Sequence, residues 1–200
     1  MYLFGASYFE TAIFKEVFQV VFILYIMAEV FIFSYTSLQN RKNLNKKKGD
    51  KGSCLVLVLG IIAIIFLNLF CKKNYLLILS ELMFWIGCVV IIVGIILRLY
   101  SVLTLGKSFT VSVQVDLNQK IIQTGPYKYI RHPAYSGSIL SLIGIAFAFR
   151  SIIGIIETII IIAAIYGYRI KIEEKILESN FKTDYQEYKT NTKRIIPFIW

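Results

Sequence analysis

The sequence predicts an all-α membrane protein with about five transmembrane helices, the last two paired as a helical hairpin, and a cytoplasmic amphipathic helix at its C-terminal end. Two observations carry this prediction. Hydrophobic residues make up 57% of the 200 residues and charged residues only 17%, whereas a typical soluble domain has roughly 45–50% apolar residues. The excess is collected into long uninterrupted runs, which is typical of membrane-spanning helices.

The first half of the chain contains three apolar runs, at residues 17–35, 54–70 and 82–105. A helix needs about 20 apolar residues to cross a bilayer, so each run is a candidate span. A basic loop, 36–53, separates the first two runs, and a short connector, 71–80, separates the next two. We therefore expect residues 1–105 to form an N-terminal domain of three spans. Because the first residues lack a basic region and a cleavage site, the first span is expected to remain as a signal anchor.

Residues 106–200 are expected to form the second domain. A long polar segment, 106–137, precedes two shorter apolar runs at 138–149 and 152–168. Neither run spans a bilayer comfortably alone, so they are expected to pair as a hairpin with its tip at Arg150. From Arg169 the chain is polar, with apolar residues at helical spacing: Ile172, Ile176, Leu177 and Phe181. This spacing predicts an amphipathic helix that lies on the membrane surface or folds back over the polar segment.

The distribution of basic residues predicts the orientation. Loop 36–53 carries six Lys or Arg, segment 106–137 carries four, and the tail from Arg169 carries seven. With five crossings, all three segments fall on one side of the membrane. Since cytoplasmic loops carry an excess of Lys and Arg, we expect an N-terminus outside and the polar segment and tail in the cytoplasm.

The same charges could suggest nucleic acid, because the net charge is +10. However, the basic residues border the apolar runs, and no basic helix, RNA-binding signature or finger motif accompanies them, so no nucleic-acid partner is expected. Cys54, Cys71 and Cys88 form no CxxC pair, and the sequence contains only one histidine that could bind a metal together with them. No metal site is therefore expected, and the cysteines are interpreted as small apolar side chains.

The stretch "TGPYKYIRHPAYSG", residues 124–137, interrupts the apolar chain with an unusual density of special residues. It holds the only histidine, two of the three prolines and three tyrosines. Gly-Pro and His-Pro are turn dipeptides, and proline restricts both itself and the preceding residue. The stretch is therefore expected to be a rigid folded loop, with residues 109–117 before it running extended along a cleft. By residue chemistry alone, an interfacial aromatic anchor remains the alternative.

The second polar feature is the pair Arg169 and Glu173 at the exit of the last span. They are four residues apart and so share a helix face. An ordinary surface salt bridge is one explanation, worth a few tenths of a kcal/mol. Their position facing the same compartment as the proline-rich loop favours a functional site.

These two motifs in this order, "TGPYKYIRHPAYSG" and then "RIKIEEKILESNFKTDYQEY" and "RIIPFIW", resemble the isoprenylcysteine carboxyl methyltransferase family and its wider relatives, the phospholipid methyltransferases. The resemblance covers roughly residues 100–200. It implies an integral membrane methyltransferase that uses S-adenosylmethionine from the cytoplasm and a lipophilic or prenylated acceptor from the bilayer.

Carried over residue by residue, the resemblance implies a cofactor site and an acceptor residue. Arg169 matches the substrate-side arginine of the family, and Arg169 and Glu173 are the residues expected to carry the reaction. At Gln119 many family members have histidine, which puts a side-chain contact there in doubt. The implied cofactor contacts are Gln119, Lys120, Ile121, Ile122, Tyr127, His132, Pro133, Ala134, Tyr135 and Glu173.

The chemistry of these residue types agrees with that assignment. A sulfonium and an ammonium are cationic, so Glu173 is a suitable partner, and tyrosine faces attract cations by roughly 0.5–2 kcal/mol. A carboxylate acceptor is already an anion and needs no strong general base, so the protein must mainly align the reactants and exclude water. Arg169 could hold the acceptor carboxylate in a forked grip, with His132 as a hydrogen-bond partner of the cofactor.

Several alternatives stay open from the sequence. The acceptor could be a prenylcysteine carboxylate, a phospholipid amine, an isoprenoid or a small hydrophobic acid. A sterol-reductase-like enzyme that binds NADPH, or a transporter or scaffold, are the rival functions. Glu29 and Glu157 lie within apolar runs, where an exposed charge is costly, so each is expected to pair inside the protein, with Arg98 as one partner. A contact with a substrate channel is the alternative role for these two acids.

Overall fold

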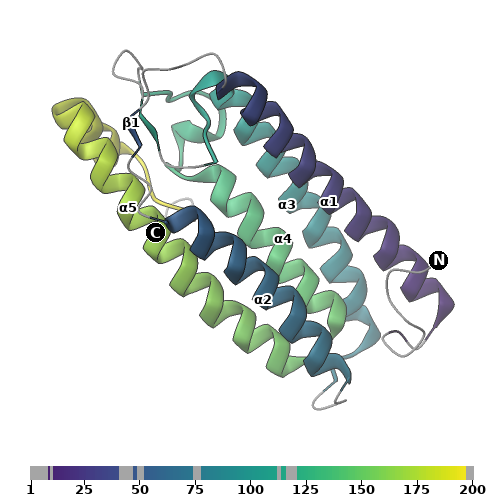
Figure 1. Cartoon of the computed structure of the whole chain (residues 1–200). Helices are drawn as coiled ribbons and strands as arrows, with labels where there is room; N and C mark the ends of the chain where they lie inside the picture. Colours follow the sequence, from purple (N-terminus) through teal and green to yellow (C-terminus); the bar gives the residue numbers. More distant parts are fainter. Residues whose placement is uncertain are drawn as a thin grey trace.

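The structure, a computed structural model, describes residues 9, 11–40, 47–48, 52–73, 78–111, 114–115 and 121–196. Over these residues the chain is an α-helical bundle (Figure 1), which confirms the expected fold class. Its five α-helices are α1 (Ala12–Asn40), α2 (Ser53–Lys73), α3 (Glu81–Leu105), α4 (Pro133–Phe149) and α5 (Ile152–Asn191).

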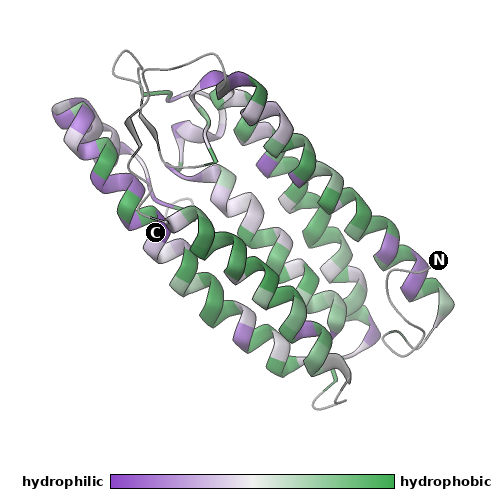
Figure 2. Cartoon of the chain, viewed as in Figure 1, coloured by the Kyte–Doolittle hydropathy of each residue, from purple (hydrophilic) through white to green (hydrophobic). Residues whose placement is uncertain are grey.

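Four of these helices are long and apolar enough to cross a membrane. They are α1, α2, α3 and α5, whereas α4 is a shorter apolar helix of 17 residues. Many large apolar side chains on the long helices are exposed, among them Phe33, Phe66 and Ile160 at 63–69%, which is costly in water and favourable in lipid. Figure 2 shows that hydrophobic residues occur along most of the length of the helices. The chain is a multi-pass integral membrane protein.

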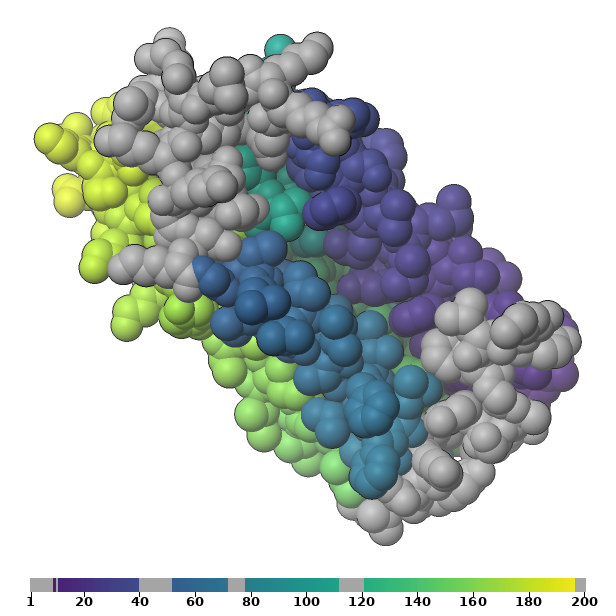
Figure 3. Space-filling view, in the orientation of Figure 1, coloured from purple at the N-terminus to yellow at the C-terminus, as the bar shows by residue number. Residues whose placement is uncertain are grey.

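The helices are arranged around α4, which is the most buried of the five. It packs against α3, α5 and α2, while α1 covers α3 on the far side and α2 lies along α5. On the face seen in Figure 3, α2 stands in front, between α5 and α1. Glycines allow α3 and α4 to approach closely: a Cβ on Gly144 would lie 2.7 Å from the Gly87 carbonyl oxygen, and one on Gly94 would lie 2.6 Å from the Gly137 oxygen. Such small-residue contacts are a common basis of helix packing in membranes.

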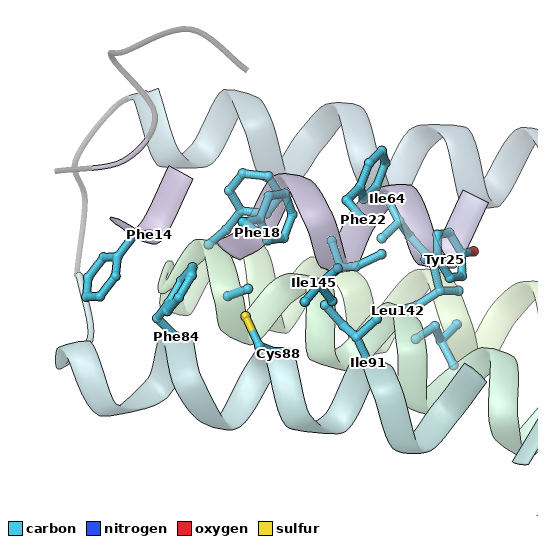
Figure 4. Packing of buried hydrophobic residues seen from close by; sticks show 14 of the residues in the cluster. Phe14, Phe18, Phe22, Tyr25, Ile64, Phe84, Cys88, Ile91, Leu142 and Ile145 are labelled. Atoms are coloured by element: carbon cyan, nitrogen blue, oxygen red, sulfur yellow. The ribbon is translucent and has the colours of Figure 1, made fainter. Parts of the chain in front are cut away.

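One end of the bundle, which we call the closed end, is formed by the starts of α1, α3 and α5 and the ends of α2 and α4. Aromatic rings fill it (Figure 4), with Phe14 stacked on Phe84 at 4.3 Å and Phe9 on Phe149 at 5.8 Å between ring centroids. The α4–α5 hairpin turns here as expected, and its tip is Arg150, in the left-handed region at φ 63°. The Arg150 Nε donates to the Leu79 carbonyl at 2.8 Å, which ties the hairpin to the segment before α3.

The opposite end, the pocket end, gathers the polar segments of the sequence. Strand β1 (Lys47–Lys48) of the basic loop pairs antiparallel with β2 (Gln114–Val115), with Lys47 opposite Val115. Two short 3₁₀ helices, η1 (Gly106–Ser108) and η2 (Gly125–Lys128), lie between α3 and α4. The three basic segments therefore meet at one end of the bundle, as the charge pattern requires, and which side of the membrane that end faces stays a prediction.

Two boundaries differ from the sequence expectation. The last span and the amphipathic tail are one helix, α5, because no proline interrupts the chain at Arg169 and the following residues favour helix. Its regular geometry breaks only at Lys182, with φ 38° and ψ −111°. The first hairpin helix begins at Pro133 and not at 138, since proline suits the first position of a helix. The second half of the proline-rich motif is therefore the first turn of α4.

Candidate functional site

A cavity of about 880 Å³ lies at the pocket end. That volume includes space that is open to solvent. Its walls come from the end of α3, η1 and the residues that follow it, the residues before η2, the proline-rich motif and α5. The lining residues are Leu105, Ser108, Phe109, Thr110, Ile121, Ile122, Tyr127, Arg131, His132, Ala134, Tyr135, Arg169, Glu173, Leu177, Phe181, Tyr185 and Tyr188.

The proline-rich motif is a folded loop, as predicted. Gly125 adopts φ 58°, where a side chain is strained, and a Cβ there would meet the Tyr100 hydroxyl at 3.0 Å. Pro126 is the second residue of η2, and its carbonyl accepts from the Tyr129 and Ile130 amides at 3.2 Å. These turns bring Tyr127 into the pocket wall, while Tyr129 is 56% exposed and does not line it.

The Tyr135 hydroxyl joins the two residues that were expected to carry the reaction. It donates to Glu173 Oε2 at 2.5 Å and accepts from Arg169 Nε at 2.9 Å. The remaining guanidinium nitrogens of Arg169 donate to Ser53 Oγ at 2.6 Å and to the Val111 carbonyl at 2.5 Å. Arg169 is only 2% exposed. A cation and an anion thus face the same pocket on either side of one hydroxyl group.

His132 lies against this group. Its ring stacks on Tyr135, with 5.5 Å between centroids and 15° between planes, and its Nδ1 lies 4.0 Å from Glu173 Oε2. Its Nε2 lies 3.5 Å from Glu174 Oε1, at the long limit for a hydrogen bond. Among the described residues, this buried nitrogen has no better-aligned partner.

Glu174 connects the motif to the chain after α5. Its Oε1 accepts from Arg131 Nε at 3.0 Å and its Oε2 from Arg194 Nε at 3.1 Å. Burial alone would raise the pKa of the Glu174 carboxyl, but the donors and charges of His132, Arg194 and Arg131 outweigh it and lower the pKa to about 2. The carboxylate is therefore ionised at neutral pH.

The segment after α5 docks beside the motif, with Thr192 extended and Lys193 in a parallel bridge with Ile130. The Arg131 amide donates to the Lys193 carbonyl at 2.7 Å, and the His132 amide donates to the Arg194 carbonyl at 3.0 Å. Ser136 Oγ adds a bond to the Ile195 carbonyl at 2.7 Å. The backbone at His132 is therefore fixed by residues some sixty positions downstream.

Of the residues expected in the site, the structure brings most together. Ile121, Ile122, Tyr127, His132, Ala134, Tyr135, Arg169 and Glu173 all line the pocket. Pro133 starts α4 between two lining residues without lining the pocket itself, and Gln119 and Lys120 lie outside the described residues. The functional roles of these residues stay predictions.

The sequence did not indicate the aromatic wall from the end of α5. Phe181, Tyr185 and Tyr188 line the pocket around the break at Lys182. The Tyr188 hydroxyl donates to the Tyr127 carbonyl at 2.7 Å, whereas the buried Tyr185 hydroxyl has no hydrogen-bond partner among the described residues. The three-residue spacing of the two tyrosines was the available signal.

The intramembrane acids pair inside the protein, as expected. Glu29 on α1 and Arg98 on α3 form an ion pair, with Arg98 Nη2 donating at 2.8 Å. Arg98 also donates from Nη1 to the Ala134 carbonyl at 3.2 Å, beneath the pocket. Glu157 accepts from the Cys71 thiol at 3.5 Å. The first pair therefore links α1 and α3 to the start of α4.

A membrane-embedded helical bundle with a charged, aromatic-walled cavity at one end defines a polytopic membrane protein with a small-molecule site. Comparison with known protein families makes this specific. The model of the family described as phospholipid methyltransferase matches residues 82–184, which include α3, α4 and most of α5 with the residues of the pocket between them. The chain belongs to the phospholipid methyltransferase family of membrane methyltransferases.

Individual relatives carry a narrower description. A probable protein-S-isoprenylcysteine O-methyltransferase of Oryza sativa subsp. indica is 29% identical over 117 residues, which are 58% of this chain and 61% of that protein. The protein-S-isoprenylcysteine O-methyltransferase of Saccharomyces cerevisiae is 31% identical over 116 residues, 57% of this chain and 48% of that protein. The matched region thus spans about three fifths or less of these relatives.

The fold also matches a solved structure. This is the eukaryotic intramembrane Ras methyltransferase, isoprenylcysteine carboxyl methyltransferase, with a TM-score of 0.61 and 23% identity. The alignment covers 92% of this chain and 68% of that one. At this identity the match shows the fold, and it extends over the N-terminal helices that the family model does not reach.

Proposed function

We propose that the protein transfers a methyl group from S-adenosylmethionine to the carboxylate of a lipophilic acceptor, and that the acceptor is an isoprenylcysteine or a close chemical relative. The observation that carries the proposal is the Arg169–Tyr135–Glu173 arrangement. It offers an anion and a cation to the same cavity, joined through one hydroxyl. The names of the similar rice and yeast proteins support the same acceptor class.

The residues present fit the cofactor chemically. Glu173, with 27% of its side chain exposed, supplies the negative charge that a sulfonium and an ammonium require. Tyr127, Tyr185 and Tyr188 supply aromatic walls that attract cations by about 0.5–2 kcal/mol. The buried Tyr185 hydroxyl beside the cavity has no hydrogen-bond partner among the described residues, and an unsatisfied polar group of this kind marks a place for a polar ligand.

When bound, S-adenosylmethionine supplies a methyl carbon that passes to the acceptor oxygen as its bond to sulfur breaks, with the electron pair staying on sulfur. The protein has no proton to remove, because the carboxylate is already ionised. Its work is to orient the acceptor and to exclude water. Since the Arg169 guanidinium already donates to three protein oxygens, acceptor binding would exchange one of these partners for a carboxylate oxygen.

The charge of Arg169 bears on the alternative acceptor, a phospholipid amine. An amine can accept the methyl group only as the neutral, deprotonated form, and its nitrogen becomes positively charged as the new bond forms. A buried arginine beside that nitrogen is therefore unfavourable. A carboxylate acceptor, in contrast, is negatively charged before the methyl transfer and is attracted by Arg169. The pocket therefore favours O-methylation of an acid over N-methylation of a lipid amine.

The proposed function is tested by binding and by transfer. We expect calorimetry to detect S-adenosylmethionine and not NADPH, and we expect radiolabel from the cofactor methyl group to appear in a farnesylcysteine acceptor and not in its methyl ester. His132→Ala and Tyr135→Ala should each weaken cofactor binding. Tyr129→Ala is the matched control, since this tyrosine of the same motif is exposed and does not line the pocket. NADPH binding with no binding of S-adenosylmethionine would favour a reductase, and no binding of either would favour a transporter or scaffold.

We further propose that the pocket end faces the cytoplasm and the N-terminus faces outside. The basic loop, the proline-rich motif and the end of α5 share this end of the bundle, and they carry most of the Lys and Arg. After Cys54, Cys71 and Cys88 are replaced, an impermeant thiol reagent added from outside should label Lys73→Cys and not Lys47→Cys. Labelling of Lys47→Cys alone would show that the orientation is the opposite of the one proposed.

A further inference from the structure

Glu174 does not line the pocket, yet it contacts two motif residues that do. Its Oε1 accepts from Arg131 and lies 3.5 Å from His132 Nε2, and its Oε2 accepts from Arg194. Only 7% of its side chain is exposed. We propose that Glu174 is a positioning residue, which holds His132 as the tautomer with hydrogen on Nε2 so that the bare Nδ1 faces the pocket as a hydrogen-bond acceptor.

The tautomer follows from what each group can do. An ionised carboxylate only accepts hydrogen bonds, and two arginines on Glu174 favour its ionised form. The imidazole nitrogen that faces it must therefore carry a hydrogen. In a neutral imidazole the other nitrogen is then bare, which is the same logic by which a buried carboxylate orients a catalytic or metal-binding histidine.

The position of the ring is fixed by two further contacts. Its stacking on Tyr135 sets the plane, and its backbone amide is held by the Arg194 carbonyl. Nδ1 then lies on the Glu173 side, 4.0 Å from Oε2. A donor group of the ligand, a hydroxyl or an ammonium, can bridge a bare Nδ1 and the Glu173 carboxylate. This step rests on the proposed function, because the ligand is the proposed cofactor.

The arrangement also separates the roles of two consecutive acids. Glu173 lines the pocket, whereas Glu174 faces away from it, toward Arg131 and Arg194. Neighbouring residues on a helix point about 100° apart, so one acid can face the ligand while the next supports the histidine. One turn of α5 therefore places a carboxylate on each side of the His132 ring, Glu173 near Nδ1 and Glu174 near Nε2.

The single histidine makes the tautomer directly measurable. In protein labelled with ¹⁵N-histidine, every imidazole signal belongs to His132. We expect the neutral form of the parent to show a protonated Nε2 and a bare Nδ1, and we expect the Nδ1 signal to move when S-adenosylmethionine is added. A parent protein with hydrogen on Nδ1, or a cofactor that binds by calorimetry without moving Nδ1, would overturn the proposal. These readings need no variant to fold.

Glu174→Gln is the second test. The amide of glutamine can donate to Nε2 of His132, which removes the preference for hydrogen on that nitrogen. We expect the tautomer to shift toward hydrogen on Nδ1 and cofactor affinity to fall about tenfold. Glu178→Gln is the matched control, since Glu178 lies one turn further along α5 and pairs with Lys189 at the surface. A Glu174→Gln protein with parental tautomer and affinity, or equal effects of both variants, would refute the role. If the parent fails to bind S-adenosylmethionine at all, the proposed function fails while the tautomer still reports on Glu174.

Discussion

The two ends of the helical bundle are built on different principles. At the closed end, phenylalanine rings fill the space between the helices, and the buried arginine at the hairpin tip, Arg150, donates to a backbone carbonyl. At the pocket end, charged and aromatic side chains surround a cavity. The same helices α3, α4 and α5 run through both ends, so the difference lies in the side chains and turns.

Residues with a left-handed backbone occur at both ends of the bundle. Gly106, Gly125 and Lys182 have positive φ, and all lie around the pocket end, whereas Arg150 is at the closed end. Beside the pocket, the buried Tyr185 hydroxyl has no hydrogen-bond partner among the described residues. An unsatisfied buried hydroxyl costs stability, and at the pocket end a ligand can supply the missing partner. The comparison teaches that changes at the closed end should alter stability, and changes at the pocket end should alter binding or turnover.

The largest expected effect is at the pocket end. Arg169→Ala should lower turnover by roughly tenfold to a hundredfold, because losing one charge-assisted contact costs about 1.5–3 kcal/mol. Cofactor affinity should stay close to that of the parent, since Arg169 is assigned to the acceptor. Arg169→Lys should recover only part of the turnover, because a point charge lacks the planar fork. Steady-state kinetics with calorimetry on the same preparations measures both quantities, and a loss of cofactor affinity equal to the loss of turnover would contradict the assignment.

The second expected effect is in the closed-end half of the α3–α4 contact. Gly144→Ala should lower the free energy of unfolding by about 2 kcal/mol, within the range of roughly 1–3 kcal/mol for overpacking. The added Cβ would lie 2.7 Å from the Gly87 carbonyl and the Ile91 amide, so two helix backbones must separate. Gly167→Ala on α5 is the matched control, because a Cβ there meets nothing within 4 Å. Denaturation in detergent should show no loss for the control, and cofactor affinity should be parental in every folded sample.

Much of the fold was predictable because lipid imposes simple rules. Backbone hydrogen bonds must be satisfied within each span, so apolar run lengths give the helices, and the break at Arg150 gives the hairpin turn. The proline-rich motif was also readable, since Gly-Pro and His-Pro restrict the backbone locally. Its placement beside Arg169 and Glu173 followed from topology and from the family resemblance.

The remaining part of the site depends on contacts between distant segments. Nothing local in the sequence indicates that α5 breaks at Lys182, or that Lys193 and Arg194 dock beside the motif. Those contacts bring Tyr185 and Tyr188 into the pocket wall and give Glu174 its partners. The sequence also did not reveal that the last span continues into the tail. The change from apolar to polar residues suggests a boundary, but the backbone hydrogen bonds of a helix do not depend on side-chain polarity.

The smallest expected effect concerns Glu173, and it sharpens the comparison within the pocket end itself. Glu173→Gln keeps the shape of the side chain and an acceptor for the Tyr135 hydroxyl, and it removes one negative charge. We expect the dissociation constant for S-adenosylmethionine to rise about tenfold, which corresponds to roughly 1.4 kcal/mol. Turnover at saturating cofactor should change less than in Arg169→Ala, because the acceptor contact remains.

Calorimetry over a range of salt concentrations adds a further test of Glu173→Gln. The affinity difference between parent and variant should persist in high salt, since a partly buried charge is screened less than a surface charge. Glu187→Gln, at an exposed position of the same helix, should bind the cofactor like the parent. If Glu173→Gln and Arg169→Ala both stayed fully active with stability changes of only a few tenths of a kcal/mol, neither residue would be part of a functional site.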